Sequence, residues 1–435
     1  MSTFTAHTSR GAARRTFLSL AALLLSALMF SLTDQSASPI DPEQFVGRAP
    51  TTVELEASVQ AAFPRQSYAP GTAAKLMFFN SAAGVTVQIL HAGPEGHPTR
   101  DHDLMNGIPV TKPASIGTVR AGRAFTIRVG NWPSGLYVAR LHASDGRLGF
   151  APFVLRPRRL GEHPIAVVLP TLTWQAYNLR DDNGDGKGDS WYADWSHKTA
   201  NLGRPFLSRG VPFGFRAYDL PFLHWLAWHD HPVDVLSDAD LIGTASGDAL
   251  RRAYRLVVFP GHHEYVTGHE YDVVERYRDL GGNLMFLSAN DFFRRVDIHG
   301  SQMHLVGLWR DLGRPEAALI GVQYIANDSG EHRGPWIVEH AESLPWLFAG
   351  SGLADRGTFA SGGIEIDHTA AASPRDVKVL AEIPNLFRRG LTAQMTYYRG
   401  ARGAQVFAAG AFTLAGSVLQ PNVGRMIDNL WQRLG

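Results

Sequence analysis

The sequence predicts two folded parts, a β-sandwich followed by an α/β domain on a mostly parallel sheet. Short apolar runs separated by Gly, Pro and Asn fill residues 52–156, as expected of closely spaced strands. An uninterrupted apolar run at 165–169 indicates a strand covered on both faces. Residues 256–288 have a strand, helix, strand pattern, and two strands joined by a helix must be parallel. We therefore place the sandwich at 45–157 and the α/β domain at 162–435.

The composition excludes several classes of protein. With 435 residues, 45% of them hydrophobic, the chain can bury a proper core, which excludes global disorder. Forty-one basic residues nearly balance 40 acidic ones without a long run of like charge, so we expect no nucleic-acid partner. The absence of cysteine excludes disulfides, thiolate metal sites and a cysteine nucleophile.

Residues 1–38 have the layout of a signal peptide. The pair Arg14 and Arg15 stands directly before an apolar stretch, 17–32, which a small polar segment follows. This arrangement resembles a twin-arginine signal, which exports folded proteins; a general secretory signal and an uncleaved anchor are the alternatives. The apolar stretch is shorter than the roughly 20 residues of a spanning helix. We expect a periplasmic or secreted protein with no stable membrane span after processing.

The first part consists of alternating strands with turn signals between them and no helical period. We expect it to pack or to bind rather than to catalyse. Its clearest strands are expected at 75–79, 85–90, 125–129 and 136–141.

The second part alternates buried strands with amphipathic helices. After the strand at 256–259, Thr267 and Glu270 form a capping box that begins a helix, and Gly281 with Gly282 ends it. Beyond Asn290 the pattern is less regular, and we expect it to complete the sheet. The other elements expected here are a helix at 221–228, strands at 233–236, 283–288, 377–380 and 405–407, and a final helix at about 422–434.

Polar residues follow three of the expected strands at the point where each strand ends. They are Tyr177 and Asn178 after the strand at 165–169, His262, His263 and Glu264 after 256–259, and Asn290 after 283–288. In open α/β sheets, loops at the carboxyl ends of the strands meet in one crevice, where ligands bind. We therefore expect these loops to converge.

Three strings carry a family resemblance: LPTLTWQAYN at 169–178, GHHEY at 261–265 and FLSAN at 286–290. In order and spacing they resemble signatures of the N,N-dimethylformamidase large (beta) subunit family, and similarity covers most of 162–435. The resemblance implies a glutamine-amidotransferase-like, flavodoxin-like sheet and an amide hydrolase. The sequence departs from the family string at His263, where aspartate is common, and at Val266, where an aromatic is common.

The same resemblance implies a mononuclear ferric ion, Fe(III), held by two tyrosinates and a glutamate, which match Tyr177, Tyr218 and Glu264. A phenol ionises near about pH 10, so only a hard, highly charged cation favours phenolate ligation at neutral pH. His262 and Asn290 match pocket residues, implying proton transfer by the histidine and an oxyanion donor in the asparagine. On composition alone, both tyrosines would be ordinary half-buried aromatics.

A second candidate site lies in an acidic, Gly-rich segment. Asp181, Asn183 and Asp185, followed by Gly186, fit the first half of a calcium loop. Tyr192 stands where that loop needs a bidentate glutamate. A Ca²⁺ site and a solvated Asp/Gly turn both remain open.

The leading hypothesis is an exported iron-dependent hydrolase of a small amide or related C–N bond. The alternatives are a non-catalytic ligand-binding protein on the same scaffold and a calcium-stabilised cell-surface protein. We expect a small-molecule substrate and either a homo-oligomer or a small companion subunit, which the family's best-known enzymes have. His229 and His231, beside Asp230, could act as metal ligands or simply end a surface helix.

Overall fold

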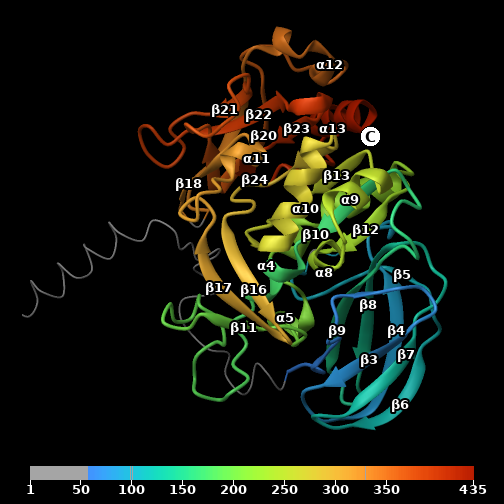
Figure 1. The fold of residues 1–435 in the computed structure, drawn as a ribbon. Coiled ribbons are helices and arrows are strands. Elements are labelled where there is room, and N and C mark those ends of the chain that lie inside the picture. Colours follow the sequence, from blue (N-terminus) through green and yellow to red (C-terminus); the bar gives the residue numbers. More distant parts are fainter. Residues whose placement is uncertain (1–56, 98, 100, 329) are drawn as a thin grey trace, which may run out of the picture. The chain divides into compact units, whose positions relative to one another are not determined.

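The computed structural model describes residues 57–97, 99, 101–328 and 330–435 (Figure 1). The predicted signal peptide, 1–38 with its arginine pair, lies outside the described residues. Within the described part of the chain, no helix is both long and apolar enough to span a membrane.

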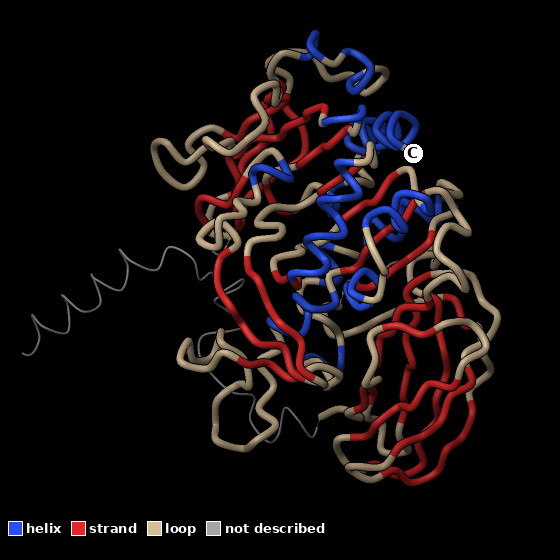
Figure 2. The backbone as a smooth tube through the Cα atoms, viewed as in Figure 1, coloured by secondary structure: helices blue, strands red, loops and turns tan. Residues whose placement is uncertain are grey.

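The first described part consists of strands in two sheets, and Figure 2 shows it without helices. One sheet has the order β1 (Ala61–Ala62), β3 (Ala73–Phe78), β7 (Ala124–Arg128). The other has the order β2 (Ser67–Tyr68), β9 (Leu148–Leu155), β8 (Gly135–His142), β4 (Ala82–His91), β5 (Ile108–Pro109), with β6 (Ala114–Val119) beside β4.

Strand β8 has two apolar faces. Tyr137 and Leu141 belong to the core between the two sheets. Leu136 and Val138 point to the opposite face, because side chains alternate along a strand, and belong to a core shared with the C-terminal part. Packing therefore crosses the predicted boundary near 157–162, and that boundary stays a prediction.

The C-terminal part contains a mixed sheet of 11 described strands. Its strands, in order, are β12 (Asp234–Ser237), β10 (Ile165–Leu169), β13 (Leu256–Phe259), β15 (Asn283–Phe286), β23 (Gln405–Ala408), β22 (Ala393–Arg399), β21 (Lys378–Ile383), β19 (Arg333–Val338), β20 (Thr358–His368) and β18 (Gln323–Asn327), with β24 (Ala411–Phe412) beside β20. The first five strands in this order, β12, β10, β13, β15 and β23, are parallel to one another. All other neighbouring strands in this sheet pair antiparallel.

The expected flavodoxin-like, mostly parallel α/β fold is therefore wrong, and the chain is rich in β-structure. A parallel connection needs a crossover of a dozen or more residues, usually a helix. Between β15 and β23 the described helices are single turns, such as α11 (Ala317–Ile320) and α12 (Pro345–Phe348). That segment therefore forms antiparallel strands instead. A further sheet pairs β11 (Thr199–Asn201), β17 (Gln302–Leu308), β16 (Arg294–His299) and β14 (Tyr265–Thr267).

The predicted strand, helix, strand unit at 256–288 is confirmed. β13 and β15 are parallel, with Val258 opposite Met285, and α10 (Gly268–Asp279) connects them after β14. The capping box is formed: Glu270 N donates to Thr267 Oγ1 at 3.2 Å, and Thr267 N donates to Glu270 Oε2 at 3.3 Å.

Helices cover both faces of the parallel strands. On one face, α7 (Leu220–Trp228) and α13 (Pro421–Leu434) share a core with Val167, Val258 and Met285. On the other, α8 (Asp238–Ile242), α9 (Gly247–Ala253) and α10 share a core with Val168, Val257 and Phe286. This two-sided burial explains why these strands are apolar throughout.

Candidate active site

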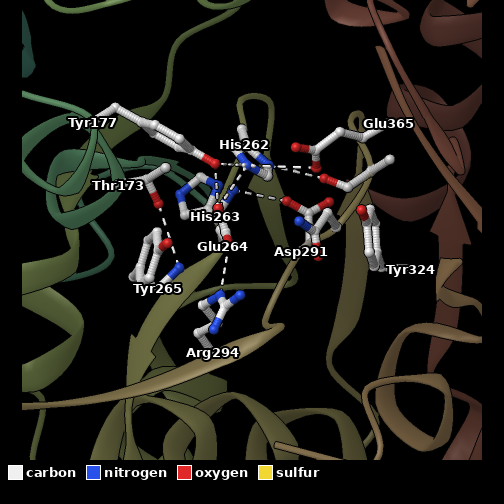
Figure 3. A network of polar contacts seen from close by, with 12 residues as sticks. Thr173, Tyr177, His262, His263, Glu264, Tyr265, Asp291, Arg294, Tyr324 and Glu365 are labelled. Atoms are coloured by element: carbon white, nitrogen blue, oxygen red, sulfur yellow. Dashed lines mark hydrogen bonds and ion pairs between the residues drawn. The ribbon is translucent and has the colours of Figure 1, made fainter. Parts of the chain in front are cut away.

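The carboxyl ends of β10 and β13 bring three of the predicted residues together (Figure 3). Residues 171–176, expected as a loop, form the short helix α4 (Thr171–Ala176), and Tyr177 is its C-cap. The Tyr177 hydroxyl donates to Glu264 Oε2 and lies 3.2 Å from His262 Nε2. His262 Nε2 also lies 3.2 Å from Glu264 Oε2, and all three side chains are buried. The structure thus places the three side chains in one pocket.

Glu264 is a buried anion with strong partners. Arg294 Nε, from β16, donates to Glu264 Oε1 at 3.1 Å, and Tyr192 Oη donates to Glu264 Oε2 at 2.9 Å. Burial alone would raise the pKa of Glu264, but its hydrogen bond and attraction to His262, together with the Arg294 charge, lower it below its ordinary value. The carboxylate is therefore ionised at neutral pH.

Three phenols surround this carboxylate: Tyr177, Tyr192 and Tyr265. The Tyr192 ring stacks on Tyr177 with centroids 4.3 Å apart, and its hydroxyl lies 2.5 Å from the Tyr265 hydroxyl. Burial, reinforced by the Glu264 charge, raises the pKa of each phenol well above 10. These hydroxyls are consequently neutral donors unless a cation is bound among them.

His262 is a charged histidine. Its Nδ1 lies 3.0 Å from the Ala289 carbonyl oxygen, and its Nε2 lies 3.8 Å from Glu365 Oε2. Burial would lower the pKa of His262, but the carboxylates of Glu365 and Glu264 outweigh it and raise that pKa to about 9. Burial and the charge of Glu264 raise the pKa of Glu365 to about 8. At neutral pH a pKa of about 8 leaves Glu365 mostly protonated, so His262 and Glu365 form a coupled pair that can hold and release protons.

Asn290, after β15, lies beside Glu365. Its backbone is in the left-handed region, with φ +54°, and its backbone N donates to Asp367 Oδ1 at 2.9 Å. Its side chain is buried, and its Oδ1 has no hydrogen-bond partner among the described residues. This oxygen can only accept a hydrogen bond from a ligand, whereas the predicted oxyanion role would fall to the Nδ2 donor, on the side chain that hydrogen-bonds Glu365.

Tyr218 ends α6 (Phe215–Tyr218) and lines a small cavity together with Tyr177, Asp219, His262 and Phe412. Its ring centroid lies 5.4 Å from that of Phe412. A wider pocket shares Tyr177, Phe213 and Tyr218 with this cavity. A small molecule in the wider pocket would therefore touch the walls of the buried cavity.

Sequence reasoning missed four polar residues of the site: Tyr192, Arg294, Asp291 and Glu365. Asp291 Oδ1 accepts from His263 N at 2.8 Å. Arg294 and Glu365 lie in strands whose course the sequence pattern left open. A signal was present at Glu365, since the alternating string IEID puts two acidic side chains on one face of a buried strand.

The predicted calcium loop forms a turn rich in side-chain to backbone hydrogen bonds. Asp181 accepts from Gly184 N at 2.7 Å and from Gly186 N at 2.9 Å. Asn183 Nδ2 donates to Asp189 Oδ1 at 2.6 Å, and Asp185 accepts from Lys187 N at 2.8 Å. Such bonds suit both a calcium loop and a plain turn, so both interpretations stand.

Within this site, Tyr177 Oη and Glu264 Oε2 lie close enough to share a metal ion, with Tyr192 Oη next to the same carboxylate oxygen. Such oxygen donors suit a hard cation.

Two solved structures show weak similarity. The superoxide reductase (neelaredoxin) from Ignicoccus hospitalis has a TM-score of 0.14 and 12% identity over 23% of this chain and 80% of that one. The sporulation control protein Spo0M from Bacillus subtilis has a TM-score of 0.16 and 12% identity over 25% of this chain and 50% of that one. At these values neither bears on fold or function.

The sequence matches are specific. The N,N-dimethylformamidase beta subunit from Alcaligenes sp is 28% identical over 41% of this chain, and the match spans only 28% of that protein. The family model described as N,N-dimethylformamidase beta subunit-like, C-terminal, matches residues 120–424, well over half of the chain. These matches confirm the resemblance seen in the three strings, and the chain belongs to the N,N-dimethylformamidase beta subunit-like family.

Proposed function

We propose that the protein is an iron-dependent hydrolase of a small amide or related C–N bond. Family membership supports amide hydrolysis. The observation that carries the proposal is the buried anion Glu264, in hydrogen-bond contact with Tyr177, which lines one pocket with His262 and Tyr218. The wider pocket that shares Tyr177, Phe213 and Tyr218 with it has room for a small ligand.

The residues present fit a ferric ion. Tyr177 and Glu264 would hold it, with Tyr218 as the third ligand that the family resemblance implies and Tyr192 beside them. In the structure the phenols have raised pKa values, so a cation would have to supply the positive charge that ionises them. When bound, the ion supplies Lewis-acid polarisation of the amide carbonyl.

The chain's own residues account for the proton transfers. Water adds to the amide carbonyl carbon and gives one proton to Glu365 in its ionised form, which is the minor form at neutral pH but a stronger base than an ordinary carboxylate. Protonated His262 gives its Nε2 proton to the leaving nitrogen, which breaks the C–N bond. The Asn290 amide donates to the oxygen that carries negative charge between these steps.

Metal and activity assays on one preparation test this proposal. We expect protein purified without chelator to contain iron, to show a tyrosinate-to-iron absorption band and to release the amine from N,N-dimethylformamide or a similar small amide. Iron-free protein with no hydrolysis of any small amide would contradict it. Chelator-treated protein is the control, and it should lose both band and turnover.

Export and assembly are proposals as well. We propose that the chain is exported by a twin-arginine signal, as residues 1–38 predict. The relative's printed name makes it a subunit, which supports a companion subunit or a homo-oligomer here. Sedimentation of the purified protein alone and with its co-purifying proteins would show the assembly.

A further inference from the structure

A second cluster of metal-ligating side chains lies away from the candidate active site. His229 Nδ1, His231 Nε2 and Asp428 Oδ1 all lie within 4.8 Å of one another. The two histidines follow the end of α7, and Asp428 lies on α13. Tyr218 and Asp219 stand at the opposite end of α7, a nine-residue helix that spans about 13 Å. The cluster is thus separate from the pocket around Glu264.

The spacing of these atoms is that of ligands rather than of hydrogen-bonded partners. Asp428 Oδ1 lies 3.8 Å from His229 Nδ1 and 3.7 Å from His231 Nε2, too long for a hydrogen bond. Ligands around a tetrahedral zinc ion, at roughly 2.0–2.1 Å from it, lie roughly 3.3–3.5 Å apart. Small side-chain rotations would close the remaining difference.

The histidine side chains are held in place before any ion binds. Asp230, with φ +51°, puts the chain in a left-handed turn between them, and His231 N donates to the Leu226 carbonyl oxygen at 2.9 Å. The His231 ring packs against Trp225 and Trp431, with centroids 4.5 and 5.0 Å away. A preorganised ligand loses less entropy on binding.

His231 Nε2 is an unsatisfied atom. It is shielded from solvent and has no hydrogen-bond partner among the described residues, although it points toward Asp428. A plain ion pair would instead need a protonated histidine at hydrogen-bond distance.

We propose that His229, His231 and Asp428 bind a divalent transition metal of the zinc class, with water completing the coordination, and that this ion links α13 to the end of α7. Two imidazoles and one carboxylate form a ligand set that suits zinc, and the half-exposed position of His229 leaves room for the water. The inference is independent of the proposed hydrolase activity.

Metal titration of the full chain tests this site, with Zn²⁺ followed by thermal melting and Co²⁺ by visible absorption. We expect Zn²⁺ to raise the melting temperature, and His229→Gln and Asp428→Asn each to weaken binding at least about tenfold. His229 is exposed, so its replacement should leave the apo fold intact. His332→Gln is the matched control, because His332 pairs with a single carboxylate, Asp328, at 2.8 Å.

Glu264→Gln separates this site from the candidate active site. We expect the Zn²⁺ response to persist in Glu264→Gln and to disappear in Asp428→Asn. The proposal is overturned if Asp428→Asn and His229→Gln bind Zn²⁺ as tightly as the unmodified protein, or if Glu264→Gln alone removes the response.

Discussion

Glu264 organises its surroundings at the scale of single residues. Its two oxygens accept from Tyr177, Tyr192 and Arg294, and His262 lies 3.2 Å away. A carboxylate with so many donors stays ionised although it is buried. The neighbouring phenols would ionise only if a cation bound beside them. Because tyrosinate bound to iron gives an absorption band, spectroscopy can test the iron proposal.

Replacing Tyr177 by Phe removes one oxygen and keeps the ring packed. We expect the protein to lose its iron and the tyrosinate-to-iron band while losing about 1.5–3 kcal/mol of folding free energy, the usual worth of a hydrogen bond to a charged group. Absorption, iron content and thermal melting measure the three effects. Tyr277→Phe is the control, because Tyr277 Oη donates to the Asn283 carbonyl oxygen, outside the site, at 3.1 Å. A Tyr177→Phe protein with full iron content would rule out ligation by Tyr177.

Removing the Asn290 amide tests its role as a donor. We expect Asn290→Ala to keep iron and to lower kcat by about a hundredfold, the usual loss for one oxyanion donor. Because φ at Asn290 is +54°, alanine is also strained there, and Asn290→Gly relieves that strain. Steady-state kinetics of both variants should show the same loss. Normal turnover by Asn290→Gly would mean that any loss in Asn290→Ala comes from backbone strain and not from the missing side-chain amide.

At the scale of elements, Glu270 of the α10 capping box forms a buried pair of acids with a residue of α8. Asp238, the first residue of α8, lies against Glu270. Burial raises the pKa of Asp238 to about 6, and burial with the charge of Asp238 raises the pKa of Glu270 well above its ordinary value. The folded state therefore favours protonated acids. Their contribution to stability is greatest below about pH 4 and is lost as pH rises through about 6.

Glu270→Gln should remove much of this pH dependence. The glutamine oxygen can accept from Thr267 N as Glu270 does, and its amide can donate to Asp238 as a protonated acid would. We expect the melting temperature of the unmodified protein to fall between about pH 5 and pH 8 relative to that of the variant. Asp248→Asn, at an exposed carboxylate paired with Arg276, is the control. If the melting temperatures of Glu270→Gln and the unmodified protein changed with pH in the same way, this pair of acids would not be the source of the pH dependence.

At the scale of the described molecule, the two parts share a hydrophobic core through β8. Leu136→Ala in that shared core should cost about 2–5 kcal/mol. We expect one calorimetric unfolding transition, which Leu136→Ala shifts to lower temperature. Activity should be lost at the same lower temperature. Ile108→Ala, at a side chain 47% exposed, should change little. Two transitions, of which Leu136→Ala moves only one, would instead show independently folding domains.

The proposed export also concerns the whole chain. We expect Arg14→Lys with Arg15→Lys to block export, because the twin-arginine pathway recognises that pair. Fractionation and mass spectrometry of the mature N-terminus measure the effect. Unaltered export of the double variant would exclude the twin-arginine pathway and favour the general secretory pathway.

Local pattern predicted some elements well. The apolar string at 256–259, the capping box at Thr267 and the paired glycines at 281–282 are signals within a few residues of one another, and they determined β13, α10 and β15. Between β15 and β23 such local signals were weak, so the antiparallel half of the sheet was missed. Pairing of β18 to β22 depends on distant partners.

The sequence by itself determined the family, the parallel strands and the meeting of Tyr177 with His262 and Glu264, because parallel strands end at one edge of a sheet. Only the tertiary structure decided that Arg294, Glu365 and Tyr192 complete that pocket and that Asp428 faces His229 and His231. These residues come from segments far apart in the chain. Their approach depends on sheet order and helix packing, which no local periodicity encodes.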